Sequence, residues 1–138
     1  MPTQKLINAL GFAGLIPFVV PAAMVANNVN YADFAIAIVE IYAFGIICFL
    51  VGSWWGMSLG TNNRVVVLIS NVYFIGALLL LSLVPSWWSL TAAILLIGIF
   101  VLEQKRSFFP SLPKYYRRMR AFLTFISGSS MLIVHFAR

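Results

Sequence analysis

The chain has 138 residues, of which 62% are hydrophobic and only 9% are charged, and its mean hydropathy is +1.00. Soluble globular domains are roughly a quarter charged, so this composition excludes a soluble domain and indicates an integral membrane protein. The formal net charge of +6 does not indicate nucleic-acid binding, because the cations lie between apolar runs, where topology and anionic lipid explain them.

Apolar runs of helix length predict an all-α membrane bundle of five transmembrane helices, folded as one domain over residues 1–138. The expected spans are residues 6–26, 34–55, 65–84, 87–103 and 120–137. The last run is short, so a four-span alternative in which it lies flat on the membrane stays open.

The first span contains two prolines, and a turn sequence follows the second span. Pro17 and Pro21 are expected to kink the outer half of the first helix, freeing carbonyls that a neighbouring helix or polar side chain must satisfy. The sequence GTNN at residues 60–63 predicts the turn before the third span.

The second span carries glycines on one edge, namely Gly45, Gly52, Gly56 and Gly60. At about 100° per residue these four positions share one face of a helix. Small residues in GxxxG spacing let the backbones of membrane helices approach one another. We therefore expect the closest helix–helix contact of the bundle along this edge.

The hydrophilic stretch between the last two spans, residues 104–119, alternates basic and aromatic residues and predicts a loop in the headgroup layer. Three cations of this stretch and Arg120, which follows it, are candidates for binding an anionic lipid headgroup such as cardiolipin. The three are Lys114, Arg117 and Arg118. The alternative is that these residues only signal topology.

Charge also predicts orientation. With a cytoplasmic N-terminus and an outside C-terminus, eight cations lie inside and only Arg138 lies outside, which fits the positive-inside rule. The expected location is a multi-pass position in a membrane. A bacterial inner membrane is favoured over a mitochondrial one, because no leader rich in Arg and Ser is present.

Glu40 is the main polar candidate, because it lies about 12 Å inside the second span and an ionisable group at that depth suggests function. It falls about 140° from the glycine edge. Three interpretations remain open: a proton or cation relay, a polar contact with a partner subunit, and a protonated carboxyl bonded to a nearby helix.

Other polar residues are expected to be structural. Asn71 in the third span is expected to bond across helices, and Cys48 to act as a small hydrophobe. His135 is the one histidine and cannot supply a metal site alone. Trp54 and Trp55 are interpreted as interface anchors. No metal or cofactor is expected.

Three segments, residues 9–18, 42–56 and 113–124, together resemble a domain-of-unknown-function family of small inner-membrane proteins that includes mitochondrial transmembrane protein 69. The matching positions are Gly14, Pro17, Phe18, Tyr42, Phe49, Leu50, Gly52, Trp55, Gly56, Tyr116, Arg117 and Arg120. Val51 and Trp54 depart from the family's pattern, which usually has a glycine and a His or Arg there. The resemblance implies a small helical inner-membrane protein and no established reaction.

The favoured function is a non-catalytic accessory or assembly subunit of a larger membrane complex, most naturally a respiratory or photosynthetic energy-converting one. The alternative is a small oligomeric transporter or channel with Glu40 as an intramembrane proton or cation site. An enzyme is not expected, since no nucleophile and base can be paired. The expected partners are membrane lipids and a larger membrane complex, without nucleic acid.

Overall fold

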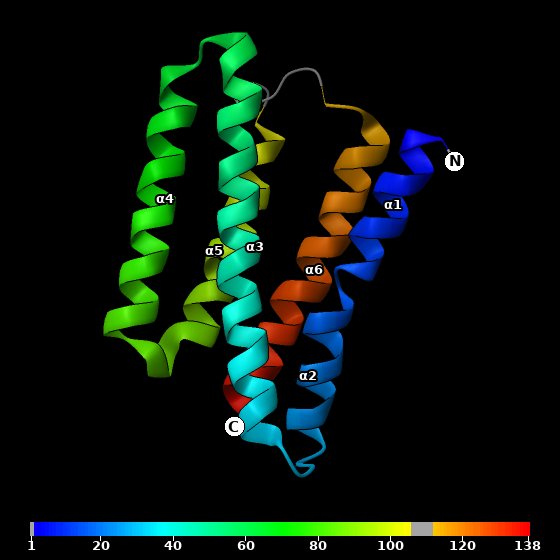
Figure 1. Ribbon diagram of the computed structural model, residues 1–138, viewed down its shortest axis with the longest axis vertical. Helices are drawn as coiled ribbons and strands as arrows, with labels where there is room; N and C mark the ends of the chain where they lie inside the picture. The colour runs from blue at the N-terminus through cyan, green and yellow to red at the C-terminus, as the bar shows by residue number, and fades with distance from the viewer. Residues whose placement is uncertain (1, 106–111) are drawn as a thin grey trace.

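The computed structural model describes residues 2–105 and 112–138, and its regular elements there are all helices (Figure 1). Five helical stretches are long and apolar enough to cross a membrane. The elements are α1 (Thr3–Ala13), α2 (Ile16–Ala26), α3 (Ala32–Thr61), α4 (Arg64–Leu83), η1 (Pro85–Trp87), α5 (Trp88–Gln104) and α6 (Lys114–Ala137). The five expected spans are therefore present as helices. Residues 106–111 of the expected basic loop lie outside the described residues.

The first span is interrupted at its middle, between α1 and α2. The amide of Phe18 bonds to the carbonyl of Leu15 at 3.0 Å, one residue closer than in an α-helix. This leaves the Gly14 carbonyl without its usual partner, and the Tyr42 hydroxyl of α3 donates to it at 2.8 Å. The interruption lies at Gly14 and Leu15, just before Pro17. Proline has no N–H to bond to the carbonyl four residues earlier, so the helix cannot continue unbroken there. We expected the kink in the outer half of the span, from both Pro17 and Pro21. Pro21 instead lies inside the continuous helix α2.

The turn between α3 and α4 lies where the GTNN sequence predicts it. Asn62 ends α3 in the left-handed conformation with φ 54°, which asparagine tolerates better than most residues. The Asn63 side chain then accepts a hydrogen bond from the amide of Val66 at 3.4 Å and caps α4. Helix α3 reaches Thr61, six residues beyond the expected end of its span at residue 55.

Helix α6 begins earlier than expected. Pro113 stands at its N-cap and Lys114 is its first residue, so residues 114–119 form the first turns of the helix and not an interfacial loop. Proline is compatible with a helix start because its fixed φ suits the first turn and its missing N–H is not needed there. The basic residues are consequently held on a rigid helix.

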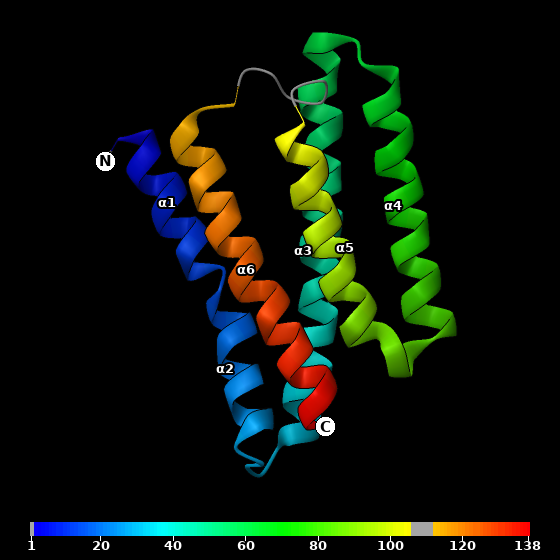
Figure 2. The same cartoon turned by 180° about the vertical axis from the view of Figure 1, so that it is seen from behind.

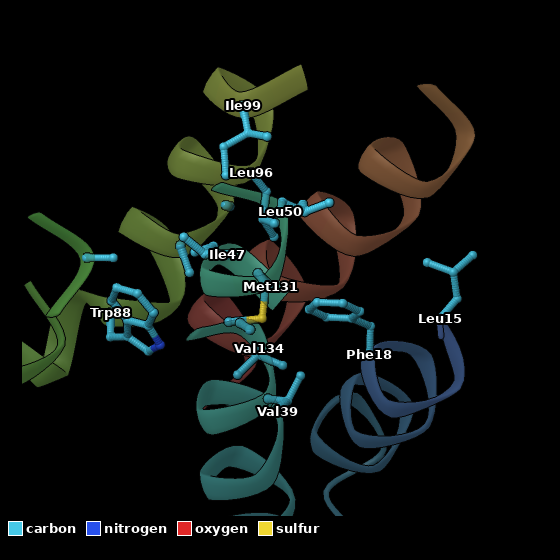
Figure 3. Packing of buried hydrophobic residues seen from close by; sticks show 14 of the residues in the cluster. Leu15, Phe18, Val39, Ile47, Leu50, Trp88, Leu96, Ile99, Met131 and Val134 are labelled. Carbon is cyan, nitrogen blue, oxygen red and sulfur yellow. The ribbon is translucent and has the colours of Figure 1, made fainter. Parts of the chain in front are cut away.

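Four helices form a ring in which α2 contacts α3, α3 contacts α5, α5 contacts α6 and α6 contacts α2. Helix α4 packs outside this ring against α3 and α5, and α1 extends along α6 (Figures 1 and 2). Apolar side chains from all four ring helices meet in the middle, with Phe18, Val39, Leu96 and Met131 pointing toward one another (Figure 3).

The glycine edge of α3 does not make the closest helix contact, contrary to expectation. All four glycines are exposed, and a Cβ built on Gly45, Gly52, Gly56 or Gly60 would meet nothing within 4 Å. The buried residues of α3, including Trp54, centre roughly 150° away around the helix. That opposite face carries polar groups that need partners inside the protein, so it is the face that turns inward.

The close approaches occur at other glycines. A Cβ on Gly11 of α1 would lie 2.9 Å from the Met119 sulfur of α6, and one on Gly98 of α5 would overlap the Tyr73 hydroxyl of α4. The interpretation of Trp54 as an interface anchor was also wrong, since this side chain is fully buried in the core. Bulky residues therefore fill the centre of the bundle.

Candidate functional site

A buried ion pair links α5 and α6 at the end of the bundle where the N-terminus also lies (Figure 1). The Arg120 Nε atom is 3.0 Å from Glu103 Oε2, and the two residues are only 6% and 2% exposed. The second carboxylate oxygen, Oε1, accepts the indole N–H of Trp54 at 3.1 Å. Both oxygens of the carboxylate are thus bonded, and three helices are tied at one point.

Arg117 extends the same network by one turn of α6. Its Nη1 atom donates to the backbone carbonyls of Glu103 at 3.3 Å and Gln104 at 3.4 Å, which are among the carbonyls that a helix end leaves unpaired. A cation beside the C-terminal end of a helix also interacts favourably with the helix dipole. Arg117 therefore provides hydrogen-bond donors for the backbone carbonyls at the C-terminal end of α5.

One nitrogen of this network is left over. The Arg120 Nη2 atom is buried and has no hydrogen-bond partner within residues 2–105 and 112–138. Buried polar atoms are almost always bonded in folded proteins, so an orphan donor requires an explanation. Arg120 also lines a cavity.

The cavity has a volume of about 490 Å³, which is within the range of small-molecule sites. Its lining is mainly apolar and comes from the broken first span, α3 and α6, with one residue of α5. The lining residues are Ile7, Leu10, Gly11, Gly14, Leu15, Phe18, Tyr42, Ile46, Phe49, Leu50, Ser53, Leu96, Tyr116, Met119, Arg120, Leu123, Thr124 and Ser127. An apolar space with a cation in its wall suits a molecule that is apolar over most of its length and polar at one end.

The interruption of the first span borders this cavity. Gly14 lies in the cavity wall, and the Tyr42 ring that satisfies its carbonyl lies there too. Tyr42 packs edge-on against Phe18 with ring centroids 5.1 Å apart. Irregular backbone at membrane depth is tolerated where it is covered or lines a cavity, and here both conditions are met.

Most hydroxyls in the cavity wall are already engaged. Ser53 donates to the Leu50 carbonyl at 2.6 Å, and Ser127 donates to the Thr124 carbonyl at 3.3 Å. The Tyr42 hydroxyl is used at Gly14, as described above. Arg120 is the charged residue in the wall, and its Nη2 atom has no hydrogen-bond partner among the residues that the structure describes.

Glu40, the main polar candidate of the sequence analysis, belongs to a second polar cluster at the opposite end of the bundle. Its Oε1 atom accepts from Ser89 Oγ at 2.8 Å and from Arg138 Nη1 at 2.6 Å. The backbone carbonyl of Glu40 accepts the Trp88 indole N–H at 3.0 Å. The structure thus gives Glu40 internal bonds to α5 and to the end of the chain.

The predicted lipid-binding cations divide into two groups. Arg117 and Arg120 turn toward α5 and the buried carboxylate, whereas Lys114 and Arg118 are exposed. Arg118 lines a smaller hollow of about 390 Å³ between α1 and α6. The four cations therefore do not converge on one headgroup site.

The remaining candidates have local roles. The Asn71 side chain donates to the Val67 carbonyl of its own helix at 2.9 Å and does not cross to a neighbour. His135 stacks against Trp87 with ring centroids 5.4 Å apart. Within residues 2–105 and 112–138, no group of three or more potential metal ligands occurs.

Sequence reasoning missed Glu103, the centre of the buried network. It was treated only as the last residue of the expected span 87–103 and was given no role. One signal could have identified it: Glu103 and Arg120 flank the junction of two consecutive spans, and antiparallel neighbours bring such residues to the same depth.

Comparison with known proteins gives one match. A family model described as "Protein of unknown function (DUF3429)" matches residues 3–136, which is nearly the whole chain. No curated protein and no solved structure matches the chain.

Proposed function

We propose that this chain, which belongs to the DUF3429 family of proteins of unknown function, is a non-catalytic membrane protein that holds an amphiphilic molecule in the cavity beside Arg120. The observation that carries the proposal is an apolar cavity of about 490 Å³ lined by one charged residue, Arg120, whose guanidinium group has a buried nitrogen without a partner in the described part of the chain. Each feature alone has structural explanations, but together they fit a ligand with an apolar body and a polar end.

The cavity is accessible to such a ligand from the membrane. Leu10 of α1 and Phe49 of α3 both line it and are 64% and 72% exposed. The cavity therefore opens to the outside of the bundle on the side between α1 and α3. An acyl or isoprenoid chain can enter from lipid there.

Native mass spectrometry of the full chain, purified in a mild uncharged detergent, tests this proposal. We expect one retained amphiphile per chain, and we expect Ile46→Trp, which fills the cavity from α3, to lose it. Ile75→Trp on the exposed face of α4 is the matched control and should retain it. Equal retention by both variants, with helical content unchanged, would refute the proposal.

A second candidate is that the chain is an accessory or assembly subunit of a larger membrane complex, such as a respiratory or photosynthetic one. The observation that favours it is the open glycine edge of α3, which leaves room for a transmembrane helix of a partner subunit. Purification in mild detergent tests it: co-migration with a stoichiometric large complex supports the candidate, and Gly52→Leu should abolish co-migration. Migration as the chain alone would refute it.

The alternative of an oligomeric channel that uses Glu40 as a proton or cation site receives less support. Glu40 already accepts bonds from Ser89 and Arg138, and a pathway needs several polar groups over its whole depth.

We also propose that the N-terminus is cytoplasmic and the C-terminus outside. The start of α1, the α3–α4 turn, the end of α5 and the start of α6 lie at one end of the bundle (Figure 1), and most cations of the described residues concentrate there, which fits the positive-inside rule. Cysteine accessibility labelling at both ends tests this orientation. A bacterial inner membrane and kinship with mitochondrial transmembrane protein 69 remain proposals that fractionation and a direct alignment can test.

A further inference from the structure

Resting on the proposed function, we propose that the amphiphile in the cavity carries an anionic oxygen head, a carboxylate or a phosphate, which Arg120 binds through its Nη2 atom. This assigns a chemical class to the ligand and a role to a residue whose structural task, the pairing with Glu103, uses only part of its guanidinium group.

The first support is the hydrogen-bonding capacity of Arg120. Its Nε atom is engaged by Glu103, while Nη2 is buried, has no partner within the described residues and belongs to a side chain in the cavity wall. Arginine has five N–H donors and no acceptor, so the missing partner must be an acceptor. An anionic oxygen is the acceptor that a guanidinium group bonds most strongly.

The second support is the local charge. Glu103 contributes one negative charge, and Arg117 and Arg120 contribute one positive charge each, so the network has a net charge of +1. The sequence has no Asp or Glu after Glu103, and Glu40 is bonded at the opposite end of the bundle. The chain therefore supplies no second anion here, and an anionic ligand would neutralise a charge held at low dielectric.

The third support is the shape of the site. Beyond Arg120 the wall is formed by apolar side chains such as Leu123, Phe18 and Ile46. A small free anion would leave this apolar space unfilled. A chain attached to the anionic head would occupy it and reach lipid beside Phe49, which gives the ligand a fixed direction in the membrane.

Competition binding to the full chain in an uncharged maltoside detergent tests the proposal. The labelled probe is hexadecanoic acid, in mildly alkaline buffer so that the acid is ionised. The competitors are unlabelled hexadecanoic acid, a one-chain lysophosphatidic acid, hexadecanol and inorganic phosphate. We expect either the carboxylate or the phosphate amphiphile to bind about tenfold or more tightly than hexadecanol, and inorganic phosphate to compete poorly.

The outcomes separate this inference from the proposed function. If hexadecanol competes as well as both acids, the cavity binds amphiphiles without reading the head, and the inference is wrong while the proposed function holds. Strong competition by inorganic phosphate alone would show a free-anion site and also overturn the inference. If no amphiphile binds, both fail.

A variant series locates the preference on Arg120. Arg120→Gln should remove the preference for the acids, but it leaves the Glu103 charge buried and unpaired. The double variant Glu103→Gln with Arg120→Gln carries no charge at the pair, should keep its helical content, and should lose the tenfold preference for the acids over hexadecanol. Arg118→Gln, an exposed cation outside this cavity, is the matched control and should keep it. Retention of the preference by the double variant would contradict the assignment.

Discussion

Replacing Glu103 by glutamine is predicted to destabilise the bundle more than the removal of any exposed charge. The substitution keeps the shape of the side chain and an oxygen that can still accept from Trp54. It removes the negative charge opposite Arg120 in a pair whose side chains are only 3% and 8% exposed. Removing one member of a buried pair leaves the other charge uncompensated, which typically costs about 3–5 kcal/mol. We expect a loss of about 3 kcal/mol in the free energy of unfolding.

The assay is unfolding of the purified chain by dodecyl sulfate titration in mixed micelles, followed by far-ultraviolet circular dichroism. The double variant Glu103→Gln with Arg120→Gln should recover most of the lost stability, because neither charge is then buried alone, and the cycle should give a coupling of about 2 kcal/mol or more. Asp33→Asn, an exposed acid, is the control and should change stability by less than about 0.5 kcal/mol. The reasoning is refuted if Glu103→Gln behaves like this control or if the double variant shows no recovery.

Three further predictions use the same unfolding assay. Gly11→Leu should cost about 1–3 kcal/mol by overpacking, because a Cβ there lies 2.9 Å from the Met119 sulfur, whereas Gly56→Leu faces open space and should not destabilise the isolated chain; the reverse order would contradict the packing described. Tyr42→Phe should cost about 1 kcal/mol, since its hydroxyl satisfies the carbonyl at the break of the first span; an unchanged stability would mean that water replaces it. Glu40→Gln should lose about 1 kcal/mol, since its salt bridge is partly exposed; an ion-conducting activity lost with full stability would instead favour a relay.

The number and order of the apolar stretches followed from the hydropathy pattern along the sequence. Five apolar stretches appear where the hydropathy predicts them, and the α3–α4 turn lies at Asn62 and Asn63 because asparagine tolerates the left-handed conformation and caps helices. The helix boundaries were less accurate. Lys114 to Arg120 were expected to be mostly loop, since basic residues usually mark a headgroup layer, but they follow Pro113 into a continuous helix.

The candidate site was only partly predictable. Arg117 and Arg120 were candidates for binding an anionic lipid headgroup, with topology signalling as the alternative, and Arg120 lines a cavity. Their partner Glu103 was not identified, because pairing across two helices depends on the rotation of each helix about its axis. One of the three interpretations of Glu40 was a protonated carboxyl bonded to a nearby helix; the structure gives it a hydrogen bond from Ser89 of α5 and an ion pair with Arg138.

The amino-acid sequence by itself determined that this chain is helical, that five stretches are apolar and long enough to cross a membrane, and that most cations lie at alternate junctions between these stretches, because these properties depend only on hydropathy and on the order of residues. The tertiary structure decided which face of each helix turns inward. From the sequence, helix α3 could pack against its neighbours either through its glycine edge or through the face that carries Glu40 and Trp54. The polar face turned inward because an unpaired carboxylate or indole N–H in lipid costs more than an exposed glycine, and this orientation of α3 places Ile46 and Leu50 in the wall of the cavity beside Arg120.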